Sequence, residues 1–425
     1  MDKKYIVLIV LGGLIVILGI VYFVFVNKPA PVTGPTELTV VSSVEEEKYL
    51  KEIIKEFEVS NNAKINFINK DVSNYETESL NMIATGDIDV WGIPNSWIYK
   101  HINKLSPYSD SSSKTIENYN NKYPQLAVDE NIYNNKIYGY PLSFDSLVLF
   151  RSQNALNAIV EANNISKDSD INLIRKIETW EDLEAQIPLL RNKLNIGLIG
   201  AGRPEQNTTP DILSWMLLQQ GTYMTNVSNN QAIFHTSANA LQGPDYPGAI
   251  ALNRLANFSS SYPDNLGDPV KAFEEGKLVY LIDYSNKADQ FKANNPKLEF
   301  ESLSVPQLKQ IKNVTDFVKY ETLTVPQSSK NSILAWKFIT FLQNPEYLQI
   351  HRTLSKENTF YNNNALSSDV TYKTLENTKN WHNPDKIATD KIFINTISDT
   401  LAGKSAQTAL DGAAVEVTKL LEKLQ

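Results

Sequence analysis

The chain has 425 residues, 42% of them hydrophobic and 21% charged, which is an ordinary composition for a globular protein of two or three lobes. The formal net charge of -8 and the absence of a basic stripe argue against a nucleic-acid partner. Because there is no cysteine, disulfides, thiol catalysis, cysteine-ligated metals and an N-terminal lipidated cysteine are excluded.

The N-terminus carries an uncharged, Ile/Leu/Val-rich run over residues 5–26. Its length is close to the roughly 20 residues that cross a bilayer core as a helix. Lys3 and Lys4 precede the run, which favours an N-terminus on the inner side of the membrane. We therefore expect a single-pass anchor over residues 1–28 with an extracellular body. The alternative is a cleaved signal peptide, although its apolar region usually spans only about 7–15 residues. Prolines within residues 29–37 predict a short, stiff tether.

The body begins with alternating strands and helices. We expect strands over residues 38–41, 64–69 and 87–93, with helices between them, the second ending near Gly86. Helical crossovers between short apolar strands predict an α/β fold with a mostly parallel sheet. Ligands of such sheets bind beyond the carboxyl ends of the strands, so residues 42–45, 71–73 and 94–97 form the expected functional rim.

A second α/β region follows. Its expected strands are residues 195–199 and 278–282. The helical patterns begin with TWEDL (179–183), a helix start, and continue over residues 210–219, 246–258, 270–275, 332–342 and 407–424.

Six ordered segments resemble the family-1 extracellular solute-binding proteins, the sugar-type receptors of ABC importers. They are DIDVW with NKLSPY (87–108), KIYGYPL running into SFDSLVLF (136–150), TWEDL (179–183), AFEEGK (272–277), VPQSSKN with AWKFI (325–339), and the last helix (409–421). The chain departs from the family at Asp283-Tyr284, where a Trp is common, and at Gln220-Gly221, where Gly-Gly is common. The resemblance covers roughly residues 37–425.

The resemblance implies a two-lobed, type II periplasmic-binding-protein-like fold behind the N-terminal transmembrane helix. Lobe one is expected over residues 38–144 and 285–320, and lobe two over 145–284 and 321–425. Three segments should cross between the lobes, near residues 145–149, 281–284 and 321–325. Such crossings permit the hinge closure by which binding proteins enclose a ligand.

The expected ligand contacts lie at strand ends, at crossings and on the helix flanking the cleft. They are Ser43, Asn95, Ser96, Trp97, Asp145, Arg203, Trp215, Tyr284 and Tyr320. Polar groups would bind sugar hydroxyls, and aromatic rings would pack on sugar faces. Each has a structural alternative: the aromatic residues could be core, and Asp145 could pair with Arg151 or cap backbone. Trp91, inside a strand, is expected to be core.

No catalytic pattern emerges from the sequence. The four histidines form no H-x-x-x-H pair, and AGKS (402–405) lacks the upstream glycine of a phosphate-binding loop. We therefore expect no cofactor, no metal and no catalysis, although a glycosidase carboxylate pair stays open. The resemblance implies capture of a small ligand, a sugar or oligosaccharide, for an ABC permease. Two alternatives to this transport role stay open: a surface sensor or adhesion receptor on the same fold, and an anchored glycoside-processing enzyme.

Overall fold

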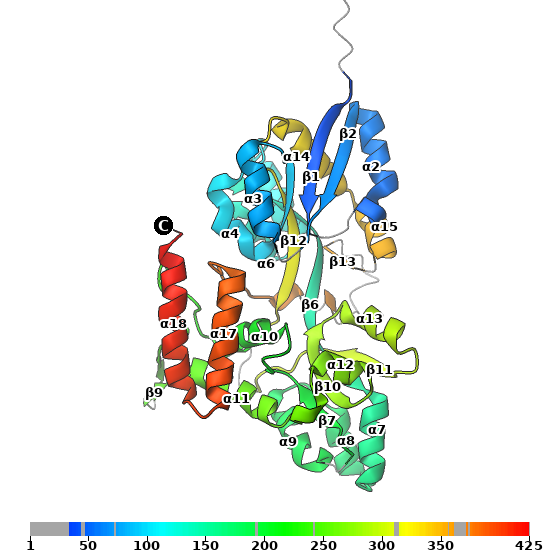
Figure 1. Cartoon of the computed structure of the whole chain (residues 1–425), viewed down its shortest axis with the longest axis vertical. Helices are drawn as coiled ribbons and strands as arrows, with labels where there is room; N and C mark the ends of the chain where they lie inside the picture. Colours follow the sequence, from blue (N-terminus) through cyan, green and yellow to red (C-terminus); the bar gives the residue numbers. More distant parts are fainter. Residues whose placement is uncertain are drawn as a thin grey trace, which may run out of the picture.

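A computed structural model describes residues 34–43, 47–71, 74–191, 194–240, 243–309, 314–355, 357–360, 371–372 and 375–424. The expected anchor, residues 1–28, and most of the tether lie outside this range. Among the described residues, no helix has the length and apolar character needed to span a membrane. Figure 1 shows two lobes stacked along the long axis and joined by central strands.

Lobe one opens with the strands and helices that the apolar spacing predicts. Its first part comprises β1 (Thr36–Ser42), α2 (Glu47–Asn61), β2 (Ala63–Asn69), α3 (Tyr75–Thr85), β3 (Val90–Pro94), α4 (Ile98–His101), α5 (Ser113–Lys122), α6 (Gln125–Asn131) and the hairpin β4 (Ile132–Tyr133) with β5 (Lys136–Ile137). Gly86 ends α3 in the left-handed conformation, with φ of 75°. This conformation favours glycine, so the expected end of the helix is confirmed.

The second lobe contains most of the chain after the long strand β6 (Tyr140–Ser152). Its elements are α7 (Gln153–Ala162), α8 (Asp168–Arg175), α9 (Trp180–Leu190), β7 (Gly197–Gly200), α10 (Thr209–Gln219), β8 (Ala238–Ala240), β9 (Gly243–Asp245), α11 (Pro247–Ser260), α12 (Pro269–Glu274), β10 (Leu278–Tyr284), α13 (Lys287–Asn294), β11 (Phe300–Leu303), α17 (Lys386–Leu401) and α18 (Ala406–Glu422). Thr179 caps α9 in a capping box with Asp182, which explains why TWEDL starts a helix.

The chain returns to lobe one through β12 (Val318–Thr324), α14 (Ser332–Leu342), α15 (Pro345–Ser355) and β13 (Asn358–Thr359). The main sheet runs β2-β1-β3-β12-β6-β10-β7, so it continues through both lobes. The outer strands pair in parallel, as expected, but β12 and β6 are antiparallel to their neighbours. The sheet is therefore mixed rather than mostly parallel, because the chain passes back and forth through its centre.

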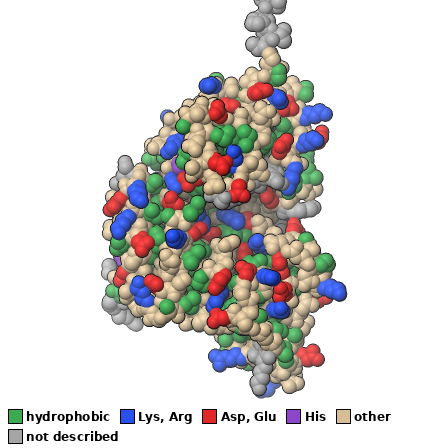
Figure 2. All heavy atoms as spheres, in the orientation of Figure 1, with side chains coloured by type: hydrophobic (Ala, Val, Ile, Leu, Met, Phe, Trp, Pro, Cys, Tyr) green, Lys and Arg blue, Asp and Glu red, His purple; other side chains and the backbone are tan. Residues whose placement is uncertain are grey.

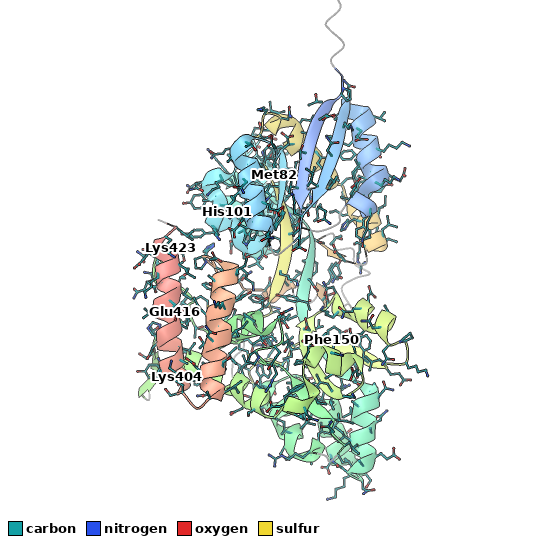
Figure 3. The ribbon with its side chains drawn as sticks, in the orientation of Figure 1. Met82, His101, Phe150, Lys404, Glu416 and Lys423 are labelled. Atoms are coloured by element: carbon teal, nitrogen blue, oxygen red, sulfur yellow. The ribbon has the colours of Figure 1, made fainter. Side chains whose placement is uncertain are left out.

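The packing corrects the expected lobe boundaries in two places. Residues 285–303, expected in lobe one, belong to lobe two, because β11 pairs with the far end of β6 and Phe291 packs near Phe150. Residues 321–360, expected in lobe two, belong to lobe one. There the ring centroids of Phe338 and Phe57 are 5.0 Å apart in the lobe-one core. Figure 3 labels Phe150 in the lower lobe and His101 in the upper lobe.

The crossings also differ from the prediction. β6 crosses as expected, since it pairs with β12 at Ser146 and with β10 from Leu147 onward. The crossing expected at residues 321–325 lies earlier, at the start of β12, because Phe317 packs in the lobe-two core and Val318 in the lobe-one core. The expected crossing at residues 281–284 is wrong, because β10 pairs on both sides within lobe two. After its return to lobe one, the chain enters lobe two again before Trp381, which packs in the lobe-two core.

Candidate functional site

The space between the lobes is hollowed at the surface, with basic side chains visible inside it (Figure 2). The two crossing strands, β6 and β12, pair with each other where the lobes meet. Lys319 on β12 is the cross-strand partner of Asp145 on β6. The hinge strands thus carry a pair of opposite charges on neighbouring positions.

Asp145 is tied to lobe two by hydrogen bonds. Its Oδ1 accepts from the Ser285 hydroxyl at 2.6 Å and from the Asn286 backbone N–H at 3.2 Å. Burial raises the pKa of Asp145, although Lys319 and these donors oppose the rise. Of the two structural alternatives for Asp145, the ion pair with Arg151 is not formed, because Arg151 pairs with Glu301. The backbone cap is formed, at the turn after β10.

Tyr284, at the end of β10, is buried beside the same strands. Only 2% of the residue is exposed, and its hydroxyl donates to Asp211 at 2.8 Å. The Lys319 ammonium lies 3.6 Å from the centre of its ring, which is cation–π distance. The ring face that we expected to meet a ligand is therefore covered by Lys319 in this conformation.

The lobe-one wall places a carboxylate at the carboxyl end of β1. Glu321 on β12 accepts hydrogen bonds from the Ser42 hydroxyl at 2.6 Å and from the Ser43 hydroxyl at 3.3 Å. A Cβ atom at Gly92 would lie 2.2 Å from Glu321 Oε1, so glycine leaves room for this carboxylate. Ser43 and Glu321 are partly exposed, and they lie where ligands of such sheets bind.

Asn95 and Tyr320 face a buried carboxylate of α6. The Asn95 amide donates to both Glu130 oxygens, at 3.4 and 3.1 Å, and accepts from the Tyr320 backbone N–H at 3.2 Å. The Tyr320 hydroxyl donates to Glu130 as well. Burial raises the pKa of Glu130 to about 7, against the hydrogen bonds from Tyr320 and Asn95. The three side chains form a polar cluster that fixes the start of β12 to β3.

Trp97 belongs to the lobe-one core. Its ring stacks on Tyr75 with centroids 5.7 Å apart and lies near Trp91, which is fully buried as expected. Only 6% of Trp97 is exposed, whereas the neighbouring Ser96 is partly exposed. The helix that begins after β3 turns the indole toward the sheet, so the expected ring contact with a ligand is not seen here.

Trp215 and Arg203 are held within lobe two. Trp215 is fully buried, and its Nε1 donates to the Thr315 carbonyl at 2.7 Å. Arg203 pairs with Asp264 at 2.9 Å and with Glu205 at 3.4 Å. Of the nine expected residues, Ser43, Ser96, Asp145 and Arg203 are partly exposed, and the other five are buried.

A charged cluster at the start of α17 was missed by the sequence analysis. Lys386 Nζ lies 2.9 Å from Asp211 and 2.5 Å from Asp390. Burial lowers the pKa of Lys386, but the two aspartates outweigh burial and raise it; burial raises the pKa of Asp390 to about 6. No local sequence pattern indicates this cluster, since Asp211 and Lys386 lie far apart in the chain. Among the described residues, no group of potential ligands could hold a metal ion.

The sequence profile of the family described as bacterial extracellular solute-binding protein matches residues 52–373. The chain belongs to this family. The match covers most of the chain. The family consists of binding proteins that act outside the cytoplasm, and the resemblance seen in the sequence is confirmed at this level. No curated protein matches the chain.

Solved structures share the fold at low sequence identity. The sugar-binding protein MalE of Xanthomonas citri is 16% identical with a TM-score of 0.73, covering 91% of this chain and 98% of its own. A cyclic alpha-maltosyl-1,6-maltose binding protein from Arthrobacter globiformis is 16% identical with a TM-score of 0.73, covering 92% and 100%. An ABC substrate-binding protein from Listeria monocytogenes, bound to cycloalternan, is 19% identical with a TM-score of 0.68, covering 91% and 98%. The described fold is therefore that of these two-lobed receptors.

Proposed function

We propose that this solute-binding protein captures a sugar or oligosaccharide between its lobes and delivers it to an ABC permease. Residues 1–28 would hold the body on the outer face of the membrane. The observation that carries the proposal is the hollow between the lobes in Figure 2, and we assign to it the partly exposed polar side chains of Ser43, Asp145 and Glu321. Hydroxyls and carboxylates offer the donors and acceptors that sugar hydroxyls need.

The solved neighbours support a carbohydrate ligand, since those named above bind cycloalternan or are named as sugar-binding proteins. The three aromatic rings expected on the flanking helix, after β3 and at the end of β10, however, are covered. Trp97, Trp215 and Tyr284 are all at least nine-tenths buried. We therefore assign recognition chiefly to hydrogen bonds from Ser43, Ser96, Asp145 and Glu321.

A screen of the full-length protein against neutral sugars and oligosaccharides tests the proposal. Unfolding can be followed by intrinsic fluorescence, because the chain has six tryptophans. A ligand at 100 times its dissociation constant should add about 2.7 kcal/mol to stability. Calorimetry of each hit and mass spectrometry of the recovered ligand then distinguish binding from turnover.

A matched pair of variants locates the site. Glu321→Ala should weaken sugar binding about tenfold, because it removes the acceptor beside Ser43. Glu275→Ala, which removes an exposed pair with Lys277 in lobe two, should leave binding unchanged. Stabilisation by no carbohydrate, or recovery of a cleaved sugar, would overturn the proposed function.

A further inference from the structure

Besides the hydrogen bond from Asn358 to Ser285, two neighbouring contacts among the described residues join the lobes away from the crossing strands. In the first, Lys100 Nζ lies 2.7 Å from Glu76 Oε1 and 3.0 Å from Asp385 Oδ2. Glu76 and Lys100 lie on α3 and α4 of lobe one, whereas Asp385 precedes α17 of lobe two. The Lys100 side chain is 15% exposed and that of Asp385 is 33% exposed, so solvent screens the pair only in part.

The second contact joins two rings. Tyr99 on α4 and His382, which precedes α17, have ring centroids 4.7 Å apart with an interplanar angle of 32°. Burial lowers the pKa of His382, which favours a neutral ring against the tyrosine. The two contacts involve neighbouring residues on each side, 99–100 in lobe one and 382–385 in lobe two. They therefore form one small interface, which we call the α4–α17 contact.

The lobe-two side of the α4–α17 contact is locally rigid. Asp385 Oδ1 caps α17 by accepting from the Ala388 backbone N–H at 3.0 Å. Asn383 Oδ1 accepts from the Asp385 N–H at 3.1 Å and from the Thr389 hydroxyl at 2.9 Å. Figure 1 shows the first turn of α17 directed toward α4, with the rest of the helix leading away. A rotation of the lobes about β6 and β12 must therefore move Asp385 relative to Lys100.

We propose that the α4–α17 contact is a latch that holds the two lobes together without a ligand. It rests on the proposed function, in which the lobes close over a solute. All its groups come from the chain itself, so the contact favours the described arrangement of the lobes whether or not a ligand is bound. Since apparent affinity scales with the fraction of protein in the binding-competent state, the latch sets affinity without touching the ligand.

Asp385→Asn tests the latch with little risk to the fold. Asparagine is as good an N-cap as aspartate, so the bond to the Ala388 N–H is kept while the charge facing Lys100 is removed. Asp399→Asn is the matched control, because Asp399 pairs with Lys404 at 2.9 Å on an exposed surface within lobe two. Tyr99→Leu removes the ring contact separately.

The readout is the distance between the lobes in unliganded, full-length protein in nanodiscs. The chain has no cysteine, so Lys51→Cys on α2 and Asp289→Cys on α13 provide two unique, exposed sites for spin labels. Pulsed electron paramagnetic resonance should show longer or broader distances for Asp385→Asn, a smaller change in the same direction for Tyr99→Leu, and none for Asp399→Asn.

Once a ligand is known, Asp385→Asn should also weaken its binding about 3- to 10-fold. Identical distance distributions for Asp385→Asn and Asp399→Asn would overturn the latch. That result is independent of the ligand screen: a protein that binds no sugar can still show the distance change, and a sugar receptor can lack it. The two failures are therefore distinguishable.

Discussion

Replacing Trp215 by Phe measures how far this indole serves the core of lobe two. The substitution keeps an aromatic ring but removes the Nε1–H that donates to the Thr315 carbonyl at 2.7 Å. That carbonyl keeps only a long bond from Gln219 Nε2, at 3.4 Å. The lost hydrogen bond should cost about 1 kcal/mol and the smaller ring about another 1 kcal/mol. Trp215→Ala should cost about 3–5 kcal/mol.

Trp336 provides the matched control. It is also buried, but its Nε1 has no hydrogen-bond partner among the described residues. Trp336→Phe therefore loses ring volume without losing a hydrogen bond, and it should destabilise the protein by about 1 kcal/mol less than Trp215→Phe. Equilibrium unfolding in guanidinium chloride measures both values, and calorimetry measures the affinity for any ligand found in the screen.

Two results would refute this reasoning. Equal destabilisation by the two Phe variants would mean that the bond to Thr315 contributes nothing measurable. A tenfold loss of ligand affinity in Trp215→Phe with unchanged stability would mean that the indole reaches the ligand, as the sequence suggested, and that the closed state differs at α10.

Three other perturbations address the site. The pKa of Glu130 is raised to about 7, so the stability gained by protonating it is fully present below about pH 4.5 and is lost as the pH rises through 7. Thermal unfolding should therefore show the parent losing about 1–2 kcal/mol of stability between pH 5 and 8, relative to Glu130→Gln. Gly92→Ala should displace the Glu321 carboxylate, because its Oε1 would lie 2.2 Å from the new Cβ. Calorimetry should then show sugar binding about tenfold weaker, and an unchanged affinity would argue against that carboxylate as a ligand group. Lys386→Met leaves Asp211 and Asp390 without their cation and should lower the free energy of unfolding by about 1–3 kcal/mol in chemical unfolding. No change in stability would show that the aspartates are solvated or protonated.

Local patterns predicted the elements of the fold because their causes are local. Apolar spacing and the cap at Thr179 identified α9, and Gly86 identified the end of α3. The lobe boundaries failed because they depend on pairing between distant segments. Nothing within residues 300–303 indicates that they add a strand to the lobe-two end of β6. A family resemblance gives the order of segments, but packing decides which lobe each segment covers.

The candidate site was predicted less well for a related physical reason. A strand end or helix start fixes where a residue lies, but the rotation of the element decides which way its side chain points. Trp97 and Trp215 lie on the expected elements, and both turn toward a core, where a large ring is best buried. The contact between Lys100 and Asp385 spans 285 positions of sequence, so no local pattern could reveal it.

Under the proposed function, the charged pair on the hinge strands links ligand binding to hinge motion. Asp145 and Lys319 lie on the two strands that cross between the lobes, and both reach groups of lobe two: Asp145 binds Ser285, and Lys319 covers the Tyr284 ring. A ligand that hydrogen-bonds to Asp145 competes with Ser285 for the carboxylate. A ligand that draws Lys319 away exposes the aromatic face beneath it. Rotation of the lobes changes the same contacts, because Ser285 and Tyr284 move with lobe two while the rest of β12 moves with lobe one. Ligand contact and hinge angle therefore act on one set of side chains, and a substitution at Lys319 should alter both together.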